Sequence, residues 1–91
     1  MTTRARGSIL ESGEEVVIGQ KREGLVPGWW CEAHVADQMY QVGILVIATE
    51  GSRPDVWGVV RDDAGKVMWQ ERVSAAVSPR DLLRQSGILP G

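Results

Sequence analysis

The longest apolar run of this chain, residues 42–48, limits the possible folds more than any other feature. The run is dominated by Val and Ile, whose branched side chains favour strands, and an extended chain would place apolar groups on both of its sides. A strand of this kind is usually covered on both sides. We therefore predict the central core strand over residues 40–49. A turn at Asp37 and Gln38 would lead into it, and Gly43 would mark a bulge or a close backbone approach.

Length and composition indicate a single small domain spanning residues 1–91. Hydrophobic residues make up 43% of the chain and charged residues 24%, as in ordinary globular domains. Residues 1–7 are small and polar, which predicts a flexible tail. No segment approaches the ~20 apolar residues of a membrane helix, and no apolar segment follows the charged N-terminus as in a secretory signal. With one cysteine, the sequence predicts a cytoplasmic protein without disulfides or a membrane span.

Strict alternation over residues 29–36 predicts a second strand, with one buried side. It places Trp29 and Cys31 on the buried side and Trp30 and His34 on the outer side. A helix beginning in the same stretch and running to about residue 40 is the alternative, and the sequence leaves it open.

The choice between strand and helix decides whether the only cysteine and the only histidine can act together. On a helix, Cys31 and His34 would share one face at i, i+3, whereas on a strand they point to opposite sides. We favour the strand, which makes Cys31 a core residue. A zinc site would need further ligands from distant carboxylates. The sequence therefore predicts no catalytic residues, no metal and no cofactor.

Two hairpins are predicted around these strands. Gly next to polar residues predicts the turn of the first, within residues 8–20. The second joins residues 56–61 to residues 66–73, with Asp62 opening a type I turn and Gly65 in the left-handed position. The resulting register places five side chains on one buried face: Trp57, Val59, Val67, Trp69 and Val73.

The end of the chain carries the signals of a short helix over residues 79–86. Ser78 suits the N-cap, and Asp81 completes a capping box. Gly87 suits the left-handed position that ends the helix. A helix this short must dock through its apolar side chains, which are Leu82, Leu83, Ile88 and Leu89.

These elements predict an α+β fold that is mostly β. We expect a single small antiparallel sheet, or a partly closed barrel, of about five to six short strands with the C-terminal helix packed on it. The sequence does not give the strand order. Five side chains are candidates for an interface or ligand surface: Trp30, His34, Tyr40, Ile88 and Leu89.

The sequence favours a small non-enzymatic interaction module that acts by self-association, as a homodimer, or by docking to another protein. An outward tryptophan and an apolar C-terminus support this hypothesis. The alternative is a nucleic-acid-binding β-barrel in which Trp30 and Tyr40 stack on bases beside Lys21, Arg22 and Arg53. A net charge of −2 opposes that alternative. A small-ligand-binding protein or an enzyme is a third hypothesis, with less support.

Overall fold

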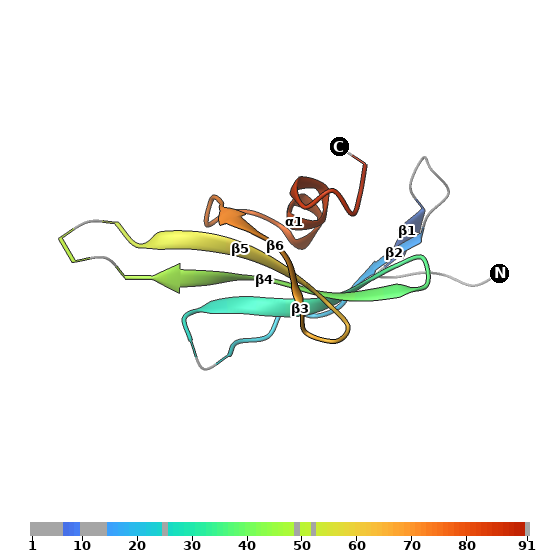
Figure 1. Ribbon diagram of the computed structural model, residues 1–91, viewed down its shortest axis with the longest axis horizontal. Helices are drawn as coiled ribbons and strands as arrows, with labels where there is room; N and C mark the ends of the chain where they lie inside the picture. The colour runs from blue at the N-terminus through green and yellow to red at the C-terminus, as the bar shows by residue number, and fades with distance from the viewer. Residues whose placement is uncertain (1–6, 10–14, 25, 49, 52, 91) are drawn as a thin grey trace.

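The structure, a computed structural model, describes residues 7–9, 15–24, 26–48, 50–51 and 53–90 (Figure 1). Its elements are β1 (Gly7–Ile9), β2 (Glu15–Ile18), β3 (Gly28–Val35), β4 (Gln38–Ile47), β5 (Asp55–Asp62), β6 (Val67–Arg72) and α1 (Pro79–Gln85). Of the predicted flexible tail, residues 1–6 lie outside the described residues, and Gly7 belongs to β1. The turn of the first hairpin, residues 10–14, also lies outside them.

The six strands form one antiparallel meander in the order β1-β2-β3-β4-β5-β6, which leaves β1 and β6 at the edges. Helix α1 packs over β4 and β5 on one side, called here the helix face (Figure 1). No helix or strand of the described chain covers the opposite side, called here the back face. The predicted α+β, mostly β fold is thus confirmed, and the sheet is open rather than closed into a barrel.

Strand β3 confirms the predicted alternation and excludes the helical alternative. Cys31, Ala33 and Val35 are buried on the helix face, and Glu32 and His34 between them are exposed. Burial of every second residue stabilises a strand in one register, because a slip of one residue would turn the apolar side chains to solvent.

The turn before β4 lies one residue earlier than predicted. Val35 pairs with Gln38, so the two turn residues are Ala36 and Asp37, and Ala36 has a φ of 54°. This register places Trp30 opposite Gly43, which has no side chain. A turn one residue later would have placed the Trp30 ring opposite a leucine. Packing between the strands thus set the register where turn chemistry was ambiguous.

Strand β4 is the central strand, as predicted, but it is covered fully on one face only. Val42 and Ile44 are buried beneath α1 on the helix face. On the back face, the side chain of Ile47 is 51% exposed. The described chain has a single helix of seven residues, which can cover only one side of the sheet. The expected cover on both sides was therefore wrong for the back face.

The turn of the β5–β6 hairpin is as predicted. The Asp62 carboxylate accepts hydrogen bonds from the backbone N–H groups of Ala64 and Lys66, at 3.0 and 2.9 Å. Gly65 occupies the left-handed region with a φ of 85°.

The predicted face of this hairpin is wrong, because β6 contains a bulge. Arg61 lies opposite Val67 as expected, but Val60, not Val59, lies opposite Trp69. One extra residue, Met68, shifts the register between these pairs and turns the rest of β6 over. Trp69 and Val73 therefore pack on the helix face. The register places the other three, Trp57, Val59 and Val67, on the back face, where Val67 is 46% exposed.

Helix α1 is capped as the sequence predicted. The Ser78 hydroxyl accepts a hydrogen bond from the Asp81 N–H at 3.1 Å, and the Asp81 carboxylate accepts one from the Ser78 N–H at 3.2 Å. The helix ends at Gln85, one residue earlier than expected, and Gly87 follows with a φ of 87°.

The helix docks where β5 has no side chain. A Cβ atom built on Gly58 would lie 2.5 Å from Leu82 Cδ2 and 3.0 Å from Trp69 Cζ3. The Leu82 and Leu83 side chains are 0% exposed, so the helix is seated directly on the strand. Gly58 thus allows the close contact that fixes α1 to the sheet.

Candidate functional site

The back face carries a strip of apolar side chains that no helix or strand of the described chain covers, although Leu45 and Trp57 are partly buried in it and Val59 is only 7% exposed. The register pairs Leu45 with Trp57 and Gly43 with Val59 on this face. Ile47 and Val26 lie at one end of the strip, and their side chains are 51% and 57% exposed. Contiguous apolar surface of this kind on a small domain is typical of an interaction site.

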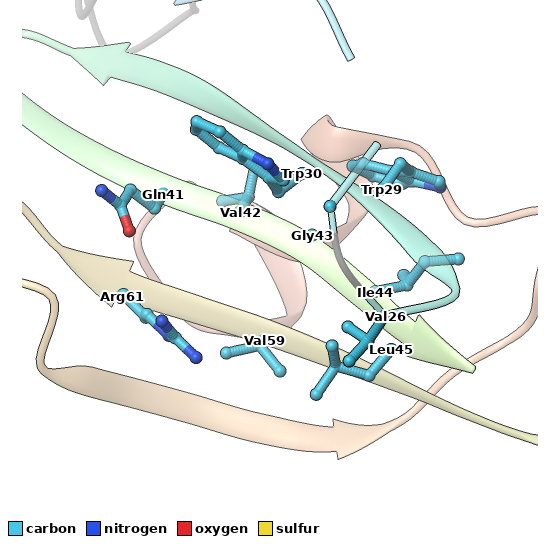
Figure 2. Close-up of a pocket in the computed structure, with 11 residues that line it drawn as sticks. Val26, Trp29, Trp30, Gln41, Val42, Gly43, Ile44, Leu45, Val59 and Arg61 are labelled. Atoms are coloured by element: carbon cyan, nitrogen blue, oxygen red, sulfur yellow. The ribbon is translucent and has the colours of Figure 1, made fainter. Parts of the chain in front are cut away.

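A groove of about 180 Å³ lies within this strip (Figure 2). Its floor is Gly43, and its walls are Trp30 from β3 and Val59 from β5. A Cβ atom on Gly43 would lie 2.9 Å from Trp30 Cα and 3.0 Å from Trp30 Cβ. The missing side chain therefore does two things: it lets β3 and β4 pack closely, and it leaves an empty position on the back face.

The two ends of the groove differ in polarity. Gln41 and Arg61, which pair across β4 and β5, lie at one end, and Val26 and Leu45 lie at the other (Figure 2). A ligand group lying along the groove would therefore meet apolar atoms over most of its length and a cation at one end.

Trp30 is held in place by a segment that runs beside β3. Arg22 and Trp30 exchange two backbone hydrogen bonds of 2.8 and 2.9 Å. The Arg22 guanidinium carbon lies 5.7 Å from the centre of the Trp30 ring, within the range of a cation–π contact. These contacts fix one wall of the groove before any partner binds.

Two arginines lie on or beside the back face, and they differ in whether another side chain pairs with the guanidinium. Arg72 forms an ion pair with Asp55 at 3.4 Å, and its guanidinium carbon lies 5.6 Å from the centre of the Trp57 ring. Within the described part of the chain, the Arg61 guanidinium has no hydrogen bond, ion pair or ring contact. The charge at the polar end of the groove is therefore available to a partner.

The five residues predicted for an interface do not come together. Trp30 and His34 lie on the back face, about 13 Å apart along β3. Tyr40 and Ile88 pack against the core on the helix face, and Leu89 is 2% exposed within that core. Of the five, only Trp30 lines the groove.

Sequence reasoning missed the other members of the site, namely Gly43, Leu45, Ile47, Val59 and Arg61. A signal for them existed, because residues 43, 45 and 47 form the second apolar side of the central run. That side was assigned to the core because a strand apolar on both sides is usually covered on both.

The only cysteine and the only histidine are separated by the sheet. Cys31 is 0% exposed, and burial raises the pKa of its thiol to about 11, against a smaller lowering by Lys21. The thiol is therefore neutral at physiological pH, while His34 is exposed on the other face. In the described ranges no group of three or more His, Cys, Asp or Glu side chains is arranged to hold a metal ion.

No helix in the described residues has the length and apolar character needed to cross a membrane. Comparisons of this chain with protein-family models, with curated proteins and with solved structures find no match.

Proposed function

We propose that this chain is a non-catalytic protein-interaction module that docks through its back face. The occupant is a protein surface that presents one aliphatic side chain with a carboxylate beside it. The observation that carries the proposal is the open apolar strip with a side-chain-sized groove at its centre.

The size of the groove supports a side chain as its occupant. An engineered protein cavity of about 150 Å³ binds a molecule as large as benzene. The groove, at about 180 Å³, therefore suits one aliphatic or aromatic side chain. The surrounding surface has the usual anatomy of an interface, since Leu45 and Val59 are flanked by the polar Gln41, Arg61 and Arg72.

The charge near the groove supports an acidic neighbour on the partner. Arg61 lies at the polar end and has no side-chain partner among the described residues, and Arg22 lies over the Trp30 ring that forms one wall. A carboxylate next to the inserted side chain would form a charge-assisted hydrogen bond with Arg61. Such complementarity mainly selects the partner and its orientation.

Nucleic acid is a poorer candidate for this surface. Trp30 and Tyr40, which were expected to form one stacking platform, lie on opposite faces of the sheet. The cations are also on opposite faces of the sheet. The Lys21 ammonium nitrogen lies 4.3 Å from the centre of the Trp29 ring on the helix face, and Arg22 lies over Trp30 on the back face. Single-strand binding depends on aromatic side chains and cations along one groove.

An enzymatic role also has little support. The Cys31 thiol is buried and neutral, and the sheet separates it from His34. A cysteine nucleophile works as the thiolate beside a base that can reach it.

Two matched surface variants test the docking proposal. Ile47 and Met68 are both about half exposed, but Met68 lies on the edge strand β6 and does not line the groove. We expect native mass spectrometry of the protein isolated gently from its own cells to show a bound chain. Ile47→Lys should lose that chain, and Met68→Lys should keep it.

Both variants should melt within a few degrees of the parent protein, because each substitution is at an exposed site. The proposal is wrong if the parent protein carries no second chain and also fails to associate with itself at about 1 mM, or if the bound chain survives both substitutions equally.

A further inference from the structure

We propose that the partner is a second copy of this chain, packed back face to back face about a two-fold axis. The axis passes through the Leu45–Trp57 pair, and Ile47 of each copy enters the groove over Gly43 of the other. This inference rests on the proposed function and names the partner that the same surface accepts.

On strand β4, the exposed Ile47 side chain and the empty position at Gly43 lie at equal distances from Leu45, on either side of it. Gly43, Leu45 and Ile47 follow one another on the back face, so Gly43 and Ile47 each lie about 7 Å from Leu45. Consider a two-fold axis that lies between the two sheets, perpendicular to the strands, at Leu45. The rotation places Ile47 of one copy over Gly43 of the other, and the reverse.

The same rotation matches the charges on β5. Asp55 pairs with Ile47, and Val59 pairs with Gly43, so Asp55 of one copy comes over Val59 of the other. Arg61 lies two residues beyond Val59, about 7 Å along the strand, which its long side chain spans. The Asp55 carboxylate of each copy, which pairs with Arg72 of its own chain, therefore comes within reach of the Arg61 guanidinium of the other.

A third match lies on the β3 side of the strip. The Val46 N–H donates a hydrogen bond of 3.0 Å to the Pro27 carbonyl, which continues the β3–β4 register and brings Val26 beside Ile47. Because Trp30 lies beside Gly43, the rotation brings Val26 of one copy over the Trp30 ring of the other.

Self-complementarity is what favours a second copy over an unrelated protein. A surface that binds a different protein needs to carry only one member of each interacting pair, such as the groove without the side chain that fills it. This face carries both halves: the exposed Ile47 with Asp55 at one end, and the groove over Gly43 with Arg61 at the other. A two-fold interface requires this arrangement.

The size of the surface predicts a weak dimer. Strands β3 to β6 at about 4.8 Å spacing and about 20 Å of strand length give a flat footprint of about 400 Å² per copy. Stable complexes bury about 800 Å² per partner. We therefore expect dissociation at low protein concentration and dimers near about 1 mM.

A charge exchange tests the register as well as the dimer. Asp55 and Arg61 lie six residues apart on one strand, about 20 Å, so a bond between them must join two copies. Sedimentation equilibrium would be run on Asp55→Arg alone, on Arg61→Asp alone and on their equimolar mixture. Asp63→Arg, at an exposed position of the β5–β6 turn, makes the same change in net charge as Asp55→Arg and serves as its control.

We expect each single variant to associate at least about tenfold more weakly than the parent, because like charges then face each other. The mixture should return to within about threefold of the parent affinity, since the heterodimer regains both interchain pairs, one with the native residues and one with the charges reversed. The control should match the parent.

The possible failures are distinguishable. A parent protein that stays monomeric at about 1 mM overturns the dimer, while loss of another bound protein in Ile47→Lys would still support docking through this face. A dimer that is unchanged in both single variants, or not rescued in the mixture, overturns the proposed register. If the parent binds neither itself nor another protein, both proposals are wrong.

Discussion

The two faces of the sheet each contain a glycine in the middle of a strand, but the two glycines have different consequences. On the helix face, Gly58 makes room for Leu82 of α1, and the position is filled by the chain itself. On the back face, Gly43 makes room for the close approach of β3, and a groove is left beside Trp30. One missing side chain thus closes the core, and the other opens a surface.

As a result, the helix face holds the core that stabilises the fold, and the back face holds the surface proposed for binding. The helix face holds the buried cluster, in which Val60, Leu82 and Leu83 are fully excluded from solvent. The back face keeps Ile47 and Val26 more than half exposed. Because burial of apolar area is the main stabilising contribution, substitutions on the two faces should have very different costs.

The largest expected effect contrasts two leucines. Leu82→Ala removes a side chain that is 0% exposed against Gly58, and we expect it to lower the free energy of unfolding by about 3 kcal/mol. Leu45→Ala, at a partly buried position of the back face, should cost about 1 kcal/mol. Urea unfolding of both variants measures the difference. Equal losses would mean that the back face is as well packed as the core.

A smaller contrast involves the tryptophans of the β5–β6 hairpin. The bulge at Met68 places Trp69 against Gly58 and the core, whereas Trp57 lies on the other face with Arg72 near its ring. We expect Trp69→Ala to cost about 2–3 kcal/mol and Trp57→Ala about 1 kcal/mol. Thermal unfolding followed by circular dichroism would measure both. Equal, large losses would argue for the register predicted from the sequence, in which both tryptophans lie on one buried face.

The smallest effect concerns the cap that holds α1 on the helix face. The hydrogen bond from the Ser78 N–H, together with the Ser78 hydroxyl, lowers the pKa of the Asp81 carboxyl. Because the pKa is lower in the folded state, the contribution of Asp81 to stability is present above its unfolded pKa of about 3.9. It is lost as the pH falls through the folded value.

Stability of the parent protein should therefore decline more steeply below about pH 4 than stability of Asp81→Asn, which has no charge to lose. Denaturant unfolding between about pH 2 and pH 6 would compare the two proteins. Parallel pH profiles would show that Asp81 does not contribute to the docking of α1.

Local patterns predicted the elements whose signals lie within a few residues. The alternation at residues 29–36 and the capping residues Ser78 and Asp81 each specify a local structure by their own chemistry, and the structure contains both. Trp30 was also correctly placed outward from its alternation alone.

The candidate site was much harder to predict than the elements. It depends on which face of the sheet α1 covers. If α1 covered the back face instead, the apolar strip would be part of the core. It also depends on a bulge at Met68, which shifts β6 by one residue and has no strong local signal.

The sequence by itself determined that this chain forms strands with one short capped helix, since periodicity, turn residues and capping act through neighbours along the chain. Only the tertiary structure decided which apolar side of β4 is buried. The run at residues 42–48 is apolar on both sides, and a single helix can cover only one of them. Gly58 admits Leu82 on the helix face, and the other face keeps an exposed Ile47 and a groove over Gly43.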